Sequence, residues 1–220
     1  GDDITISSDG VTEFTLRGTL EAADTIAITT GAGDDTLVIE DQRFVSTAAT
    51  SGAVTAEQAR AMVADIVIDM GAGADQLGLL ATELVGDTRI LGGSGEDLIT
   101  VYHLNSRAAQ LHIDGEGGSD TVRVLVSDVD AANQQSDYIL SVLDSGERDD
   151  GVDQLFIEGI GYEPFAAAEE FTGYSTAEDD IFLIRRNFIA RLHGSYEAAV
   201  YSEFVERINY DESINGRITI

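Results

Sequence analysis

Aliphatic residues alternate with polar ones on both sides of a recurring glycine-rich segment. The chain before each segment reads as a short strand, as in Thr25–Ile28 and Asp65–Ile68, and every second residue after it is again aliphatic. Period-two alternation is typical of a β-strand that buries one face. The flanking aliphatic residues lie nine positions apart in four copies: Ile28/Leu37, Ile68/Leu77, Ile90/Ile99 and Ile113/Val122. The pattern therefore predicts pairs of strands joined by turns of constant length.

Each glycine-rich segment ends in an aspartate, and these residues are Asp35, Asp75, Asp97, Asp120 and Asp153. Successive aspartates are 40, 22, 23 and 33 residues apart. A unit of 22 residues is too short for a βαβ crossover with its strands, which takes roughly 30. It suits one coil of a solenoid, in which strands stack about 4.8 Å apart. We expect an all-β fold, a right-handed parallel β-helix or β-roll solenoid.

Two segments modify this pattern. Thr55-Ala-Glu-Gln58 resembles a helix capping box, so we expect one small helical excursion near residues 55–63. The opening residues Asp2 to Ile6 read as a turn already under way, with Asp2 at the aspartate position. Both ends of the chain read as cut edges of a solenoid.

The last part of the chain has a different composition. Ten of the fifteen aromatic residues lie in 160–220, without a similar glycine-rich turn. We expect residues 1–160 to form the regular coils and residues 161–220 to continue the same solenoid around a larger aromatic core. A separate small β subdomain is the alternative. The strands expected in this part are 180–184, 188–192, 204–209 and 217–220.

Charge excludes several classes of partner. Asp and Glu number 41 against 12 Lys and Arg, which gives a formal net charge of −29. Such a charge opposes binding to nucleic acids and anionic membranes and favours cations. No apolar run approaches the roughly 18 residues that a membrane span needs. The chain has no Cys, so an extracellular location would require a means of stabilisation other than disulfide bonds.

Stacked coils would place the aspartates in a file. Two unit charges about 4.8 Å apart repel by roughly 3–4 kcal/mol at an effective dielectric constant of 20, whereas domains are stable by about 5–15 kcal/mol. The file therefore needs a counter-charge. Calcium, which takes six to eight oxygen ligands in flexible geometry, suits carboxylates and backbone carbonyls better than magnesium does. Zinc and copper are disfavoured because the chain has no Cys and three scattered histidines.

The turns resemble the Gly-Gly-x-Gly-x-Asp-x-aliphatic-x nonapeptide of the repeats-in-toxin (RTX, haemolysin-type) calcium-binding family. Residues 92–100 match every position, and the copies at 30–38 and 70–78 lack only the first glycine. The copy at 115–123 has Glu116 in place of the second glycine. The resemblance implies calcium-dependent folding after secretion from a Gram-negative bacterium. Family members usually carry two nonapeptides per coil, whereas one per coil here predicts a single row of ions.

The expected calcium ligands are carbonyl and carboxylate oxygens of the turns, from Gly31, Gly33, Asp35, Gly71, Gly73, Asp75, Gly93, Gly95, Asp97, Gly115, Gly118, Asp120 and Asp153. The turn before Asp153 is longer than the others, so we expect Asp97 to matter more than Asp153.

The function expected from these features is that of a calcium-stabilised structural repeat module. Residues 205–220 also resemble segments of very large bacterial surface proteins, which favours an adhesin or an extracellular filament. Its partners would be calcium ions and neighbouring copies of the repeat, with surface polysaccharide as a further partner. It would not be an enzyme or insert into membranes, and a signal outside this segment would export it to the cell surface or the medium.

Two alternatives remain. The first is a carbohydrate-active parallel β-helix protein, with lyase-like or epimerase-like activity, or the calcium-binding accessory module of one. Its groove would use Arg185, Arg186, Arg191, Tyr174 and Tyr201. The second, ice binding, ranks last because the early threonines are not repeated at matching places in later coils.

Overall fold

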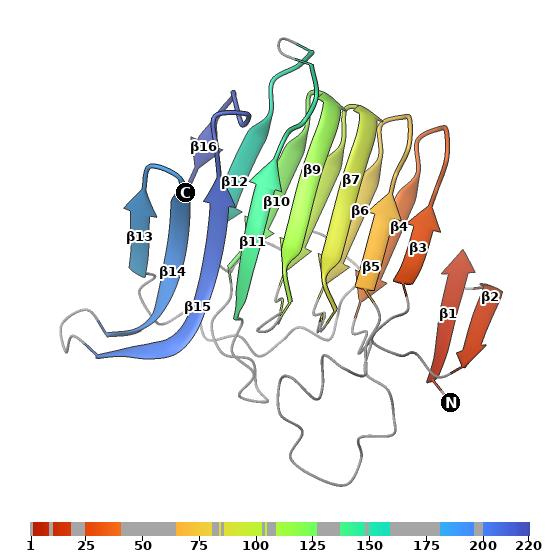
Figure 1. Ribbon diagram of the computed structural model, residues 1–220, viewed down its shortest axis with the longest axis horizontal. Helices are drawn as coiled ribbons and strands as arrows, with labels where there is room; N and C mark the ends of the chain where they lie inside the picture. The colour runs from red at the N-terminus through yellow and green to blue at the C-terminus, as the bar shows by residue number, and fades with distance from the viewer. Residues whose placement is uncertain are drawn as a thin grey trace, which may run out of the picture.

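The computed structural model describes residues 2–8, 11–18, 25–40, 65–80, 84, 86–102, 104, 109–126, 137–147, 150–158, 181–195 and 200–220. All regular elements in these ranges are β-strands, so the fold is all-β as predicted (Figure 1). The described residues contain no helix of the length and apolarity that crossing a bilayer requires. The helix predicted near residues 55–63 lies outside the described residues.

One sheet has six strands, and all its neighbouring strands run parallel. In spatial order its strands are β16 (Ile218–Thr219), β12 (Gln154–Glu158), β10 (Thr121–Leu125), β8 (Leu98–Tyr102), β6 (Gln76–Leu80) and β4 (Thr36–Glu40). One face of this sheet packs against the second sheet, because buried side chains of both sheets belong to one cluster.

The second sheet has eight strands. In spatial order they are β13 (Ile181–Arg185), β14 (Phe188–Ser195), β15 (Val200–Tyr210), β11 (Tyr138–Leu143), β9 (Leu111–Gly118), β7 (Thr88–Gly95), β5 (Asp65–Asp69) and β3 (Thr25–Thr29). From β3 to β15 the neighbouring strands are parallel. The chain alternates between the two sheets, because each strand from β3 to β11 in this sheet is followed by one in the other.

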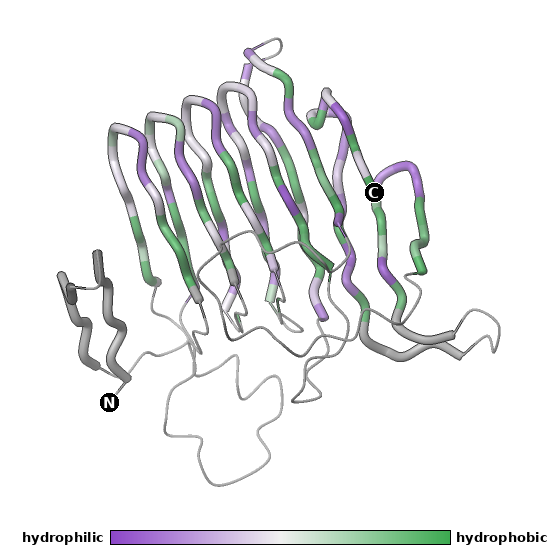
Figure 2. The backbone as a smooth tube through the Cα atoms, turned by 180° about the vertical axis from the view of Figure 1, so that it is seen from behind, coloured by the Kyte–Doolittle hydropathy of each residue, from purple (hydrophilic) through white to green (hydrophobic). Residues whose placement is uncertain are grey.

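Aliphatic side chains from both sheets form one core. Ile68, Ile90 and Ile113 occupy the same register position in β5, β7 and β9, and all three are fully buried. Leu77 and Ile99 occupy equivalent positions in β6 and β8. Apolar and polar residues alternate along these strands (Figure 2), as expected for strands that bury one face. The strands predicted from the alternating pattern are confirmed, and so are the inward residues that flank the first four turns. Before the fifth turn the inward residue is Val142, which pairs with Ile113, rather than Leu143.

The first two strands differ from the prediction. The opening residues do not form a turn of the repeating kind: β1 (Asp2–Ser8) pairs antiparallel with β2 (Val11–Gly18) in a separate two-stranded sheet. The physical reason is visible in the sequence, where Asp9 and Gly10 separate two alternating runs. Asp-Gly between such runs is a strong hairpin signal because both residues tolerate positive φ.

The C-terminal strands continue both sheets in part. β15 pairs parallel with β11, and β16 pairs parallel with β12. Between β12 and β15 along the chain, β13 and β14 form an antiparallel hairpin that adds to β15. All four strands predicted in this region are therefore present, but β13 and β14 are not parallel coil strands. The division of the chain near residue 160 stays a prediction.

Candidate calcium-binding turns

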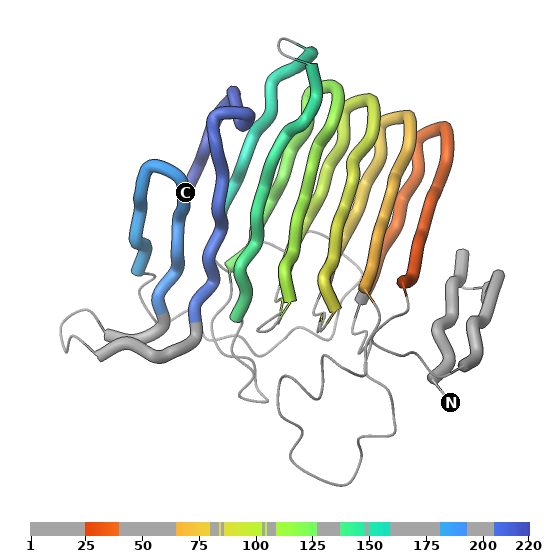
Figure 3. Tube along the Cα trace, viewed as in Figure 1, coloured from red at the N-terminus to blue at the C-terminus, as the bar shows by residue number. Residues whose placement is uncertain are grey.

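Five turns connect the two sheets along one edge of the molecule (Figure 3), joining β3 to β4, β5 to β6, β7 to β8, β9 to β10 and β11 to β12. Residues with positive φ recur two positions apart in the first four: Gly31 and Gly33, Gly71 and Gly73, Gly93 and Gly95, and Glu116 and Gly118. The glycine values range from 91° to 150°, and that of Glu116 is 69°. Residues with a Cβ rarely adopt this conformation, which explains the glycine spacing.

Glycine is also needed because successive turns touch. A Cβ added at Gly71 would overlap the carbonyl oxygen of Gly31, and one added at Gly93 would overlap that of Gly71. The same two carbonyls accept hydrogen bonds from the next turn, from the N–H of Ala72 at 2.9 Å and of Ser94 at 2.8 Å. These glycine carbonyls, which the sequence offers as metal ligands, thus hold neighbouring turns together.

The aspartates that end the turns form a continuous hydrogen-bond ladder, the aspartate ladder. The backbone N–H of each aspartate donates to Oδ1 of the next one along the chain. The four bonds run from Asp35 to Asp75 at 2.7 Å, Asp75 to Asp97 at 2.8 Å, Asp97 to Asp120 at 2.9 Å and Asp120 to Asp153 at 3.1 Å. The structure therefore brings together all five aspartates that the sequence singles out.

The other carboxylate oxygen of each ladder aspartate is buried and unsatisfied. Oδ2 of Asp35, Asp75, Asp97, Asp120 and Asp153 has no hydrogen-bond partner among the described residues. The last four of these residues are at most 3% exposed. A buried acceptor without a donor costs roughly 1–3 kcal/mol, and more when it is charged. Each Oδ2 therefore requires a proton, a water molecule or a cation.

In two turns Oδ2 lies against the first glycine of its own turn. A Cβ added at Gly92 would lie 2.8 Å from Oδ2 of Asp97, and a Cβ at Gly115 would overlap Oδ2 of Asp120. Neither Gly92 nor Gly115 has a positive φ. Their role here is to leave space for the carboxylate.

The fifth turn carries a glycine that the sequence analysis missed. A Cβ added at Gly146 would overlap the carbonyl oxygen of Glu116, and one at Gly151 would overlap that of Gly118. These two glycines therefore continue the two glycine columns, and the insertion lies between them. The spacing hides this glycine: Val142 holds the register position of Ile113, and Gly146 follows it by four residues instead of three.

Asn215 ends the aspartate ladder and was also missed. Its Oδ1 accepts a hydrogen bond from the N–H of Asp153 at 3.1 Å, and its Nδ2 donates to the carbonyl of Gly151 at 3.2 Å. The N–H of Gly216 donates to the carbonyl of Asp153 at 2.9 Å. Because the amide accepts the ladder bond without a negative charge, the charged part of the ladder stops at Asp153.

A further carboxylate stands beside the ladder in the fifth turn. One oxygen each from Asp120, Asp144 and Asp153 lies within 4.8 Å of the other two. Oδ1 of Asp144 accepts from the N–H of Gly146 at 3.1 Å, and the N–H of Asp144 donates to Oγ of Ser213 at 3.0 Å. Three acidic groups therefore meet where the fifth turn and the C-terminal loop adjoin.

Burial raises the pKa of three carboxyl groups at this edge, those of Asp97, Asp120 and Asp144. Burial raises the pKa of Asp97 to about 6, with a smaller contribution from the charge of Asp75. Burial likewise raises the pKa of Asp120 to about 7, helped by the charges of Asp97 and Asp153. The pKa of Asp144 rises to about 6 through burial and the neighbouring Asp153. Hydrogen bonds from backbone N–H groups oppose these rises without cancelling them.

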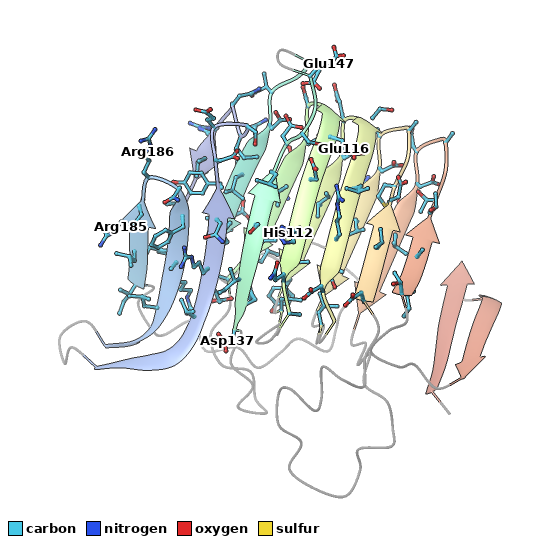
Figure 4. The ribbon with its side chains drawn as sticks, viewed as in Figure 1. His112, Glu116, Asp137, Glu147, Arg185 and Arg186 are labelled. Carbon is cyan, nitrogen blue, oxygen red and sulfur yellow. The ribbon has the colours of Figure 1, made fainter. Side chains whose placement is uncertain are left out.

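The donor set fits calcium. The unsatisfied atoms at this edge are carboxylate oxygens, which are the ligands that hard divalent cations prefer. The chain has no Cys, and His112 contacts Gln110 at 3.3 Å through Nε2 rather than any ladder aspartate. In Figure 4, Glu116 and Glu147 mark the edge where the turns stack, whereas His112 lies partway along β9.

The basic residues considered for polysaccharide binding are divided between two environments. Arg191 is buried and its guanidinium donates to Oε2 of Glu206 at 3.1 Å, so it faces no ligand surface. Arg185 and Arg186 are exposed at the tip of the β13–β14 hairpin (Figure 4). Tyr174, and the side chain of Tyr201, lie outside what the structure describes.

Comparisons of the chain with protein-family models, with curated proteins and with solved structures found no match. What the chain does must therefore be inferred from its own residues, of which the aspartate ladder is the most informative group.

Proposed function

We propose that the chain is a calcium-stabilised structural module built as a right-handed parallel β-roll, related to the repeats-in-toxin family. The observation that carries this proposal is the row of buried Oδ2 atoms without a donor. Oδ1 of Asp75, Asp97, Asp120 and Asp153 accepts a backbone N–H from the preceding turn, so Oδ2 is the oxygen that lacks a partner.

Calcium would supply positive charge where the ladder lacks it. The residues that would hold the ions are Asp75, Asp97, Asp120 and Asp153, with backbone oxygens of the adjoining turns. In the absence of an ion, burial and the neighbouring charges raise the pKa of Asp97 and Asp120 and so favour their protonated carboxyls. An ion that binds only the folded chain stabilises it by about 2.7 kcal/mol per site when free calcium is 100 times Kd.

The setting that suits such a module is the cell surface or the medium. Extracellular calcium modules work at about 10⁻⁴–10⁻³ M, a range suited to a folding switch upon export. The chain has no Cys, so bound ions would stabilise the fold in place of disulfide bonds. We propose a non-catalytic role within a long adhesin or filament, with neighbouring copies and surface polysaccharide as partners.

A carbohydrate-active protein is the second candidate. It would use the exposed Arg185 and Arg186, but the buried ion pair of Arg191 with Glu206 removes one of its three proposed arginines. It therefore has less support than the structural role. Turnover or binding of uronate polymers by the purified chain would favour it.

Calcium-dependent unfolding tests the proposed function. Thermal unfolding of the chelator-treated chain should be followed by circular dichroism in buffer alone, in about 5 mM magnesium and in about 5 mM calcium. These ion concentrations exceed the Kd of about 10⁻⁴–10⁻³ M at which extracellular calcium modules bind. Calcium should raise Tm and the β-signal, magnesium should do so much less, and chelator should reverse the gain. Identical transitions in calcium and in chelator would defeat the proposal.

A further inference from the structure

We propose that Asp120, Asp144 and Asp153 form a three-carboxylate calcium site that fills before the rest of the row. The inference rests on the proposed function, because it names the site within the turns that binds calcium most tightly. Asp144 is not part of the repeated motif; it directly follows β11 and precedes the insertion in the fifth turn.

The geometry joins two independent observations. One carboxylate oxygen of each residue lies within 4.8 Å of the other two, close enough for a single ion to contact all three. Oδ2 of Asp120 and Oδ2 of Asp153 are buried with no hydrogen-bond partner in the described part of the chain. Their side chains are 3% and 2% exposed, so water reaches them poorly. These unsatisfied oxygens are what a bound cation would complete.

Charge count distinguishes this site from its neighbours. Between Asp75 and Asp97 the ladder offers two carboxylates, whereas Asp120 of the fourth turn joins Asp144 and Asp153 of the fifth to offer three. In oxygen-ligand sites the number of charged ligands is a main determinant of calcium affinity. A cluster of three negative charges also repels itself most strongly when empty, so it gains most when the ion binds.

Asp144 is also held in place before an ion arrives. Its N–H donates to Oγ of Ser213 at 3.0 Å, and the Ser213 hydroxyl in turn donates to Oδ1 of Asp211 at 2.5 Å. Oδ1 of Asp144 accepts from the N–H of Gly146. Ligands fixed in advance lose little conformational entropy on binding. Because Ser213 and Asp211 lie in the loop before β16, an ion here would also fasten the C-terminal segment.

Calorimetric titration of calcium into the full chelator-treated chain tests the inference. The unaltered chain should show a tight class of sites followed by a weaker one. Asp144→Asn keeps an acceptor for the N–H of Gly146 and removes one charge, and should weaken the tight class by about tenfold or more. Glu147→Gln removes one charge from an exposed residue of the same turn and should leave both classes nearly unchanged. Asp97→Asn should weaken the second class and spare the first.

Each outcome has one meaning. Loss of the tight class in Asp144→Asn, with both classes kept in Glu147→Gln, supports the site. An unchanged tight class in Asp144→Asn overturns it, while calcium binding by the row still stands. Absence of any calcium heat in the unaltered chain instead defeats the proposed function. Should Asp144→Asn fail to fold by circular dichroism, Asp144→Ser replaces it, with the same loss expected.

Discussion

The backbone N–H of Asp75 donates a 2.8 Å hydrogen bond to Oδ1 of Asp97, a residue 22 positions further along the chain. The bond joins two successive turns and uses one carboxylate oxygen, while Oδ2 of Asp97 stays buried without a partner among the described residues. The same division recurs along the ladder. In Asp75, Asp97, Asp120 and Asp153 one oxygen therefore fixes the stacking of the turns, and the other is buried without a partner among the described residues.

Replacing Asp97 by Asn separates these two roles. Asn keeps Oδ1 as the acceptor for Asp75 and removes the charge. Without calcium, Asp97→Asn should raise the free energy of unfolding by about 1–3 kcal/mol at pH 7.5, because a buried charge is lost. In millimolar calcium the variant should be less stable than the unaltered chain, because an ion ligand is lost.

Urea unfolding with and without calcium measures the change in the free energy of unfolding, and its sign, in each condition. Glu96→Gln is the matched control, since it removes a charge from the exposed residue beside Asp97 and should change little in either condition. A change of the same sign with and without calcium would mean that the charge of Asp97 has no role in ion binding.

Stability without calcium should fall as pH rises. The folded-state pKa values of Asp97 and Asp120, about 6 and about 7, lie above the ordinary value of 3.8. The folded chain thus binds protons more tightly than the unfolded chain does. The stabilisation from these protons is complete below about pH 3.8 and is lost as pH rises through 6 to 7.

Calcium should remove most of this dependence, because the ion replaces the proton as the counter-charge. The check is Tm across pH 4.5 to 8 in chelator and in calcium, where the two curves should diverge as pH rises. Parallel curves, or a Tm in chelator that increases towards pH 8, would contradict the ladder's role.

Gly93→Ala tests the contact between turns. Gly93 has a φ of 104°, and a Cβ there would overlap the carbonyl oxygen of Gly71. We expect a loss of roughly 2–4 kcal/mol in calcium, from backbone strain and separation of the turns. Gly117→Ala is the control, because a Cβ at Gly117 would have its nearest neighbour at 3.6 Å. Equal losses for the two variants would mean that the turns do not stack as closely as the structure shows.

A separate prediction concerns the buried ion pair between Arg191 and Glu206, near the β13 end of the eight-stranded sheet. Arg191 of β14 and Glu206 of β15 are both nearly inaccessible, and their side chains bond at 3.1 Å. Arg191→Met should cost about 3–5 kcal/mol, because it leaves a buried carboxylate without its main partner. Arg191→Met with Glu206→Leu should recover most of that loss. Arg186→Met, at the exposed hairpin tip, should be nearly neutral in chemical denaturation.

The regular part of the fold could be predicted because the alternating pattern, the glycine-aspartate turns and the constant spacing all indicate the same strands. Because Ile68/Leu77 and Ile90/Ile99 share the nine-residue spacing, the two units can stack with equivalent residues side by side. The structure shows this register: Ile68 pairs with Ile90 between β5 and β7, and Leu77 pairs with Ile99 between β6 and β8. The antiparallel hairpins could not be derived from that spacing. β1 and β2 follow a local Asp-Gly signal, and β13 and β14 lie outside the repeat.

The site was predicted only in outline. The sequence identifies the aspartates, but which oxygen meets which N–H depends on displacements of less than an ångström. Asn215 and Asp144 were missed because neither fits the glycine-aspartate pattern, although both contact it in space. The sequence ranked Asp153 below Asp97 because its turn is longer, and the proposed three-carboxylate site reverses that order.

Diffraction from crystals grown in calcium tests the central claim most directly. An anomalous difference map should show peaks in a single row along the turn edge, about 2.3–2.6 Å from Oδ2 of Asp97, Asp120 and Asp153. The peaks should vanish when the crystals are transferred into chelator. Well-ordered turns with no anomalous peak beside these oxygens, at calcium concentrations above 5 mM, would contradict the claim that calcium neutralises the aspartate ladder.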